Sequence, residues 1–182
     1  MFPATRPAAM YPWQAQLTQA SPYAGWLQVP GSLTHALMRR CPKFNVLRLC
    51  QDLDLPHADE VEALALVPGQ QAMVREVLLR CADIPLVFAH SVIPSGGLRG
   101  PWKQLTDLGS RPLGAALFAD PRIHRHPLEF KRVDREHPLH AKAGVHLGQP
   151  PANLWARRSL FTLEDQPILV TEVFLPEVLN LP

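Results

Sequence analysis

Apolar and polar residues alternate with a period of two over several short segments of the chain, a pattern typical of β-strands. Strands are predicted over six segments: residues 44–55, 72–82, 85–94, 127–134, 153–163 and 167–175. The second and third segments meet around Ala82-Asp83-Ile84-Pro85, and the fifth and sixth are joined by Glu164-Asp165-Gln166. Each of these two pairs is therefore predicted to be a β-hairpin.

Helices are predicted between the strands. Ser32 is a good N-cap, so a helix is expected to begin there and to continue through Leu33-Thr34-His35-Ala36-Leu37-Met38. A glycine-rich stretch at 95–100 leads to short predicted helices near residues 101–108 and 112–118. Strands joined by hairpins, with helices placed between them, indicate an α+β fold with an antiparallel sheet.

The chain has 182 residues, which is the length of one domain that can bury a hydrophobic core. Residues 1–22 are predicted to be a loosely packed N-terminal lead-in, and residues 23–182 to be the single domain. The first residues include early prolines and no uninterrupted apolar stretch of the kind found in signal peptides. No segment approaches the ~20 apolar residues of a membrane span, so we expect a cytoplasmic protein.

Composition argues against some partners and cysteine chemistries. The net charge of +2 is too small to indicate nucleic-acid binding, and no basic run is interleaved with aromatic residues. The three cysteines, Cys41, Cys50 and Cys81, are odd in number, lack CxxC spacing and lie within apolar segments. They are predicted to be small core residues in a reducing compartment.

Two charged residues interrupt the apolar faces of predicted strands. Arg75 shares its face of the 72–82 segment with apolar side chains, and Glu172 does so in the 167–175 segment. Burying an unpaired charge is costly, so each of the two side chains needs a partner. Two interpretations remain open: the two residues pair with each other, or they line a closed pocket that binds a polar, anionic ligand.

Two predicted helix starts support the second interpretation. Ser32 places the amide of Leu33 in the first turn of its helix. Pro112 suits the first position of the next helix, which leaves the amide of Leu113 without an intrahelical partner. Free amides at helix N-termini bind carboxylates, although water often takes that place.

Five blocks of sequence follow one another in order between about Trp26 and Pro176 and have to be considered together. They are Val74-Arg75-Glu76-Val77-Leu78-Leu79, Phe88-Ala89-His90-Ser91-Val92-Ile93-Pro94, Arg111-Pro112-Leu113-Gly114, Leu154-Trp155-Ala156-Arg157-Arg158-Ser159 and Leu169-Val170-Thr171-Glu172-Val173-Phe174-Leu175-Pro176. In combination they resemble the bacterial chorismate pyruvate-lyase family, although no single block is specific.

The resemblance implies a single antiparallel sheet of about six strands with helices packed on it, and an enclosed site. It implies a cofactor-free enzyme that converts chorismate to 4-hydroxybenzoate and pyruvate, the first committed step towards ubiquinone. Arg75 and Glu172 are then the catalytic residues and also bind the substrate, and the backbone of Leu33 and Leu113 contacts it. Chorismate and 4-hydroxybenzoate are the expected small-molecule partners of a protein that we expect to be a monomer.

The reaction implied by the resemblance makes the ring aromatic, so the protein mainly has to position the substrate and stabilise charge. Arg75 and the helix-start amides are expected to hold the ring carboxylate. Glu172 is expected to bind the ring hydroxyl. The ring proton then goes either to Glu172 as general base or directly to the leaving enolpyruvyl group, and the sequence leaves both routes open.

The chain departs from the family pattern at two places. His90 stands where the family often has an arginine; it is either a substrate-binding group when protonated or a core histidine. Residues 135–151 resemble an insertion and are predicted to be an exposed, mobile connection. Five histidines lie in or near the insertion, but their irregular spacing favours a solvated loop over a catalytic metal site: His124, His126, His137, His140 and His146.

A binding protein is the competing interpretation. Small-molecule-sensing domains of some bacterial transcription regulators resemble the lyase fold, so the chain could bind an aromatic acid without turning it over. Such a regulator is expected to carry an N-terminal helix-turn-helix domain, and the residues before Trp26 are too few to form one.

Overall fold

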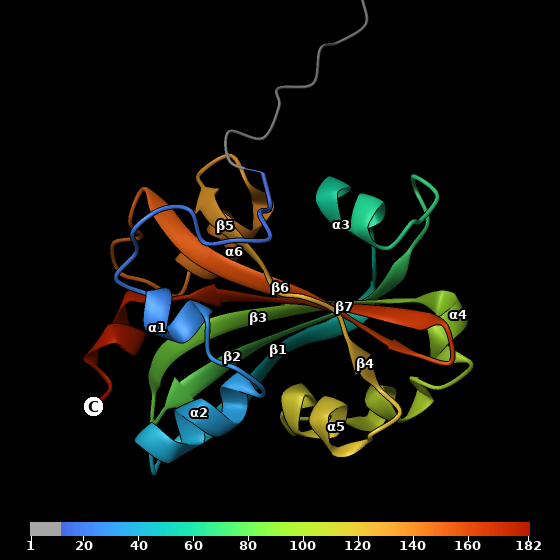
Figure 1. Cartoon of the computed structure of the whole chain (residues 1–182), viewed down its shortest axis with the longest axis horizontal. Coiled ribbons are helices and arrows are strands. Elements are labelled where there is room, and N and C mark those ends of the chain that lie inside the picture. Colours follow the sequence, from blue (N-terminus) through green and yellow to red (C-terminus); the bar gives the residue numbers. More distant parts are fainter. Residues whose placement is uncertain (1–11) are drawn as a thin grey trace, which may run out of the picture.

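The computed structural model describes residues 12–182, so the first eleven residues of the predicted lead-in lie outside the described residues. Its centre is a seven-stranded antiparallel sheet (Figure 1). The strand order is β1-β2-β3-β7-β6-β4, and β5 also pairs with β6. The strands are β1 (Phe44–Asp54), β2 (Ala72–Cys81), β3 (Ile84–Pro94), β4 (His124–Arg125), β5 (Glu129–Asp134), β6 (Asn153–Leu163) and β7 (Gln166–Phe174).

Helices cover both faces of this sheet, and α2 and α5 lie on one side of it while α3 and α6 lie on the other (Figure 1). The helices are α1 (Ala24–Leu27), α2 (Leu33–Arg40), α3 (Ala58–Ala63), α4 (Ser95–Leu98), α5 (Leu113–Ala119) and α6 (Pro138–Gly144), with 3-10 turns η1 (Lys103–Asp107) and η2 (Pro176–Asn180). None of the helices in the described part of the chain has the length and apolar character that crossing a bilayer requires. The predicted α+β fold with one antiparallel sheet is confirmed.

The alternating patterns predict the strands well. All six predicted strands are present, the two hairpins are β2–β3 and β6–β7, and the short strand β4 is additional. The helix predicted after Ser32 is α2, and the hydroxyl of Ser32 accepts a hydrogen bond from the His35 amide at 3.4 Å. The predicted helices near 101–108 and 112–118 correspond to η1 and α5.

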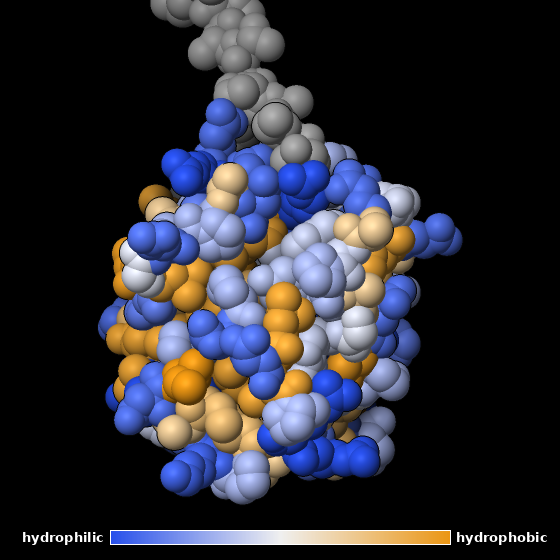
Figure 2. Space-filling model, turned by 90° about the vertical axis from the view of Figure 1, so that its left-hand side faces the viewer, coloured by the Kyte–Doolittle hydropathy of each residue, from blue (hydrophilic) through white to orange (hydrophobic). Residues whose placement is uncertain are grey.

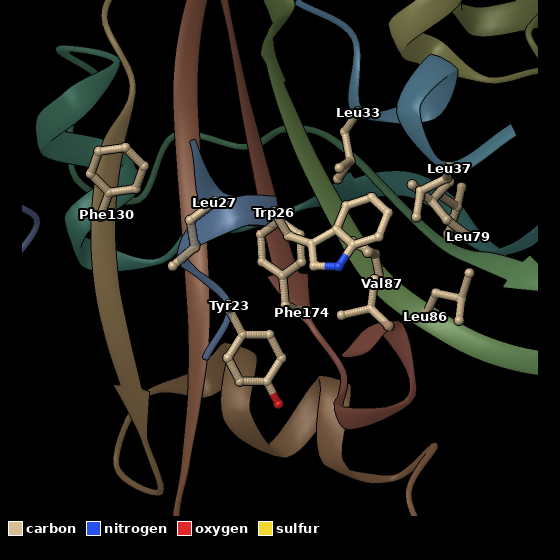
Figure 3. Packing of buried hydrophobic residues seen from close by; sticks show 12 residues of the cluster. Tyr23, Trp26, Leu27, Leu33, Leu37, Leu79, Leu86, Val87, Phe130 and Phe174 are labelled. Carbon is tan, nitrogen blue, oxygen red and sulfur yellow. The ribbon is translucent and has the colours of Figure 1, made fainter. Parts of the chain in front are cut away.

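The largest part of the core lies under α1 and α2 on one face of the sheet. Trp26 from α1 and Leu33 and Leu37 from α2 point towards Leu79 and Val87 of the sheet (Figure 3). This packing anchors the start of α2 over the sheet, where it borders the site described below. On the outer surface nearest α1 and α2, apolar and polar residues are mixed (Figure 2).

The segment 135–151 is not the exposed connection that its prolines and glycines predict. It forms α6, and Leu139 and Ala143 are buried against the face of the sheet opposite α2. Pro138 occupies the first turn, where a missing amide costs nothing, and the ring of His137 accepts a hydrogen bond from the Leu139 amide at 3.2 Å. The proline therefore starts a helix here rather than breaking one.

Two cysteines form a disulfide, so the prediction of three free core thiols is wrong for them. Cys41 follows α2 and Cys81 ends β2, and their Cα atoms lie 5.8 Å apart. Cys50 is the free cysteine of the described residues. The cross-link ties α2 to the sheet, and it is unusual for a protein of a reducing compartment.

We expect reduction of the Cys41–Cys81 disulfide to lower the free energy of unfolding. The bond closes a sequence separation of 40 residues, and a native disulfide of this kind stabilises a domain by about 2–4 kcal/mol. Thiol titration of the unfolded protein should detect one thiol before reduction and three afterwards. Denaturant unfolding with and without reductant measures the stability change, and detection of three thiols in the unreduced protein would contradict the bond.

Candidate active site

A cavity lies between the α2–α5 side of the sheet and these two helices. Its floor comes from four adjacent strands, because the strand register places Arg75, Ser91, Val170 and Ser159 in one row across β2, β3, β7 and β6. The next row carries Val77, Ala89, Glu172 and Arg157. The starts of α2 and α5 complete the wall with Leu33, Thr34, Pro112, Leu113 and Gly114.

Arg75 lies in this wall as a buried cation. The residue is only 5% exposed. One terminal nitrogen of its guanidinium donates hydrogen bonds to the carbonyls of Gly109 at 3.0 Å and Arg111 at 3.1 Å. Burial and the charge of Arg48 lower the pKa of Arg75 to about 10. Among the described residues no carboxylate pairs with it, and its buried Nε has no hydrogen-bond partner. An anion in the cavity fits this guanidinium.

Glu172 does have a partner, and it is not Arg75. Its Oε2 accepts a hydrogen bond from the Nε of Arg157 at 2.6 Å. Arg157 is 1% exposed and also donates to the carbonyls of Leu27 and Val29. The interpretation in which Arg75 and Glu172 pair with each other is therefore wrong, while the one in which both line a pocket agrees with the lining residues.

Arg157 is one of the two charged site residues, with Arg125, that sequence reasoning missed. It occupies the same face of β6 as Ser159 and Phe161, so it interrupts an apolar face just as Arg75 and Glu172 do. The signal was present in the alternation of the strand. It was hidden by Arg158, because two adjacent arginines leave open which of them faces the core.

A third arginine completes the charge of the cavity. Arg125 of β4 donates hydrogen bonds to the hydroxyl of Ser159 at 3.3 Å and the carbonyl of Gly31 at 3.2 Å, and it stacks over Phe161. Burial and the charge of Arg157 lower the pKa of Arg125. The three arginines and Glu172 are the charged residues of the lining and together carry a formal charge of +2, which matches a dianion.

The two helix starts whose free amides are predicted to bind a carboxylate, at Leu33 and Leu113, lie next to each other. Helices α2 and α5 are in contact, and a Cβ built on Gly114 would lie 3.2 Å from both the Ser32 and the Thr34 hydroxyl oxygens. Leu33 and Leu113 are the first residues of their helices, so their amides have no intrahelical acceptor. The structure thus brings both to the cavity that contains Arg75.

His90 lies on the wrong face of the sheet to contact this cavity. The register pairs Arg75 with Ser91 and Glu76 with His90, so His90 points away from the cavity towards α3. There it is 1% exposed and lies 3.0 Å from a carboxylate oxygen of Glu60 and 3.0 Å from one of Glu76. Of the two alternatives for His90, the structure therefore agrees with a core histidine and not with a residue that contacts a substrate in this cavity.

The histidines at 124–146 do not converge on a single point in the described structure. The rings of His124 and His126 contact each other, and His137 lies 3.2 Å from Asp59. His140 is hydrogen-bonded to the Pro151 carbonyl, and the ring of His146 stacks on that of Phe88. The group of potential metal ligands found in the described residues includes none of them.

Comparison with protein families gives a match over nearly the whole chain. The model of the family described as "Chorismate lyase" matches residues 8–180. A protein from Nitrosospira multiformis, named "Probable chorismate pyruvate-lyase", is 47% identical over 176 residues, which cover 96% of this chain and 98% of that protein. One of the same name from Nitrosomonas europaea is 49% identical over 156 residues, covering 86% of this chain and 88% of that protein.

Solved structures with a similar fold are more distant in sequence. The ligand-binding domain of a putative GntR-family transcriptional regulator from Bordetella bronchiseptica has a TM-score of 0.53 at 18% identity, covering 74% of this chain and 85% of that one. The effector domain of PhnF from Mycobacterium smegmatis has a TM-score of 0.52 at 11% identity, covering 81% and 90%. At these identities the likeness extends to the fold alone.

Proposed function

This chain belongs to the chorismate lyase family, and we propose that it acts as a chorismate pyruvate-lyase that releases 4-hydroxybenzoate and pyruvate. We further propose that the reaction needs no cofactor, takes place in the cytoplasm in a monomeric enzyme, and supplies 4-hydroxybenzoate for ubiquinone synthesis. The single observation that best supports the activity is the cavity in which the buried Arg75, which no carboxylate of residues 12–182 pairs with, faces the same space as Glu172.

The charge of the cavity suits the substrate. Chorismate carries two carboxylates, one on the ring and one on the enolpyruvyl group, and the lining carries a formal charge of +2. Arg75 and the amides of Leu33 and Leu113 bind the ring carboxylate, because a guanidinium and free helix-start amides both donate to anions. Arg125 is then left for the second carboxylate on the other side of the cavity.

The chemical step needs little from the protein beyond placement and a proton acceptor. The hydrogen on the hydroxyl-bearing ring carbon leaves as a proton to Glu172, and its electron pair completes the aromatic ring. The ether bond to the enolpyruvyl group breaks, and the released enolpyruvate takes up a proton to become pyruvate. Arg157 holds Glu172 at 2.6 Å and fixes the direction of its carboxylate towards the cavity.

Incubation of the purified chain with chorismate tests the activity directly. We expect 4-hydroxybenzoate and pyruvate to appear in equal amounts without added metal or cofactor, as measured by chromatography and a coupled pyruvate assay. Binding of chorismate or 4-hydroxybenzoate without turnover would contradict the proposal. It would instead support a sensing protein of the same fold, for which the regulator domains offer a likeness in fold only.

Gly114 offers a test of whether α2 and α5 enclose the product. We expect Gly114→Val to weaken inhibition by 4-hydroxybenzoate about tenfold, because its side chain would press on Ser32 and Thr34 and overpacking costs ~1–3 kcal/mol. Progress curves at rising product concentration measure the effect. Gly25→Val is the matched control, since a Cβ at Gly25 meets no atom within 4 Å. Equal inhibition of both variants would argue against closure at this contact.

A further inference from the structure

A second group of buried polar side chains lies on the face of the sheet opposite the cavity. His57 is the N-cap of α3 and Glu60 is its third residue, so both point from the start of this helix towards the sheet. His90 of β3 meets them there, and its ring stacks on that of His57 at a centroid distance of 5.2 Å. One ligand-type atom from each of the three residues lies within 4.8 Å of the other two.

These three atoms are buried and have no hydrogen-bond partner. They are His57 Nε2, Glu60 Oε1 and His90 Nε2, and they make up three of the five such side-chain atoms in the described residues. Glu60 Oε1 and His90 Nε2 are 3.0 Å apart without the geometry of a hydrogen bond. Glu60 Oε1 and His90 Nε2 form an ion pair with each other, and an ion bound between them and His57 Nε2 would give all three atoms the directed bond that buried polar atoms nearly always have. Arg75 Nε, in the substrate cavity, is another of the five.

The remaining polar atoms of the group are already fixed in place. His90 Nδ1 lies 3.0 Å from Glu76 Oε1, and Glu60 Oε2 accepts a hydrogen bond from the His57 amide at 2.8 Å. Histidines that bind metal ions usually donate the proton of their other ring nitrogen to a carboxylate, which leaves the first nitrogen free as a ligand. Glu76 is placed to play that part for His90, and Lys142 binds the same carboxylate.

We propose that His57, Glu60 and His90 bind a divalent transition-metal ion such as Zn²⁺ on the opposite face of the sheet from the cavity. Two imidazole nitrogens and one carboxylate oxygen are a ligand set that these ions accept, with water in the remaining position. Neighbouring ligands of tetrahedral Zn²⁺ lie about 3.4 Å apart, which is close to the 3.0 Å between Glu60 Oε1 and His90 Nε2, and none of the three atoms is more than 4.8 Å from another.

The proposed ion would tie α3 to β3. Two carboxylates, Glu60 and Glu76, are buried in this group with His90 and Lys142 as their ion-pair partners, so a divalent cation would take the place of the His90 proton as the counter-charge. Binding of the ion between α3 and β3 would stabilise the folded state without contributing to the reaction in the cavity. The proposal does not depend on the lyase activity and can be tested separately.

Metal binding is measured on the full chain after treatment with a chelator and dialysis. Titration with Zn²⁺ by calorimetry, and with Co²⁺ by visible absorption, should give one ion per chain, and thermal unfolding should shift to higher temperature with the ion. Two variants remove a ligand and preserve the local structure. His57→Asn keeps a good N-cap, and Glu60→Gln keeps the shape of the side chain. Each should weaken binding at least about tenfold.

His124→Asn is the matched control, since His124 and His126 form the most obvious competing histidine pair and lie elsewhere in the fold. We expect it to bind the ion like the unaltered chain. Absence of binding in the unaltered chain, binding that survives both His57→Asn and Glu60→Gln, or loss in His124→Asn alone would each overturn the proposal. Unfolding curves recorded without metal show whether the variants are folded.

Discussion

Replacement of Arg75 by alanine should lower kcat/KM for chorismate about 100-fold or more and should abolish measurable binding of 4-hydroxybenzoate. The guanidinium is buried, lines the cavity and has no carboxylate partner among the described residues. A charge-assisted hydrogen bond to a carboxylate contributes about 1.5–3 kcal/mol, and its loss also leaves the anion of the substrate without this partner in the cavity. Steady-state kinetics and calorimetric titration with 4-hydroxybenzoate measure both effects.

Arg80→Ala is the control for this experiment. Arg80 lies on the same strand, bonds to Asn45 and does not line the cavity. It should keep kcat/KM within a few fold. Thermal unfolding separates a binding defect from a folding defect: Arg75→Ala should remain folded, since removal of a buried cation without a counterion also removes a desolvation cost. Unchanged product affinity in Arg75→Ala would remove this residue from the site.

Strand faces could be predicted from the sequence, but the pairing of those faces could not. Alternation alone identified Arg75 and Glu172 as charges on core faces. It also placed His90 on one face of its strand, yet only the register shows that this face carries Glu76 rather than Arg75. The register depends on a shift between Leu79 and Arg80 in the β2–β3 hairpin, which no residue pattern reveals.

Two short helices and the disulfide between distant cysteines could not be predicted from the sequence either. Helices α3 and α6 have six and seven residues, too few for a clear helical period, and their starts at His57 and Pro138 resemble loop signals. The Cys41–Cys81 bond joins residues 40 positions apart, and cysteine spacing in sequence does not encode such a distance in space. The polar groups that these elements bring to the second face of the sheet could therefore not be foreseen.

Replacement of Glu172 by glutamine should lower kcat about 10²- to 10⁴-fold while the affinity for 4-hydroxybenzoate changes much less. A positioned general base contributes rate enhancement of this size, and the amide of glutamine cannot take the ring proton. The amide keeps the shape and can still accept a hydrogen bond from the ring hydroxyl. Arg157 stays anchored by the carbonyls of Leu27 and Val29, so we expect the local structure to persist.

Glu164→Gln provides the control. Glu164 lies in the exposed turn that joins β6 to β7, so this substitution removes the same charge as Glu172→Gln without changing the cavity. Single-turnover kinetics are needed beside steady-state rates, since slow product release would mask a change in the chemical step. A large loss of product affinity with the single-turnover rate intact would mean that Glu172 only binds the hydroxyl. The ring proton would then pass directly to the enolpyruvyl group, and positioning by Arg75, the helix starts and Arg157 would account for the catalysis.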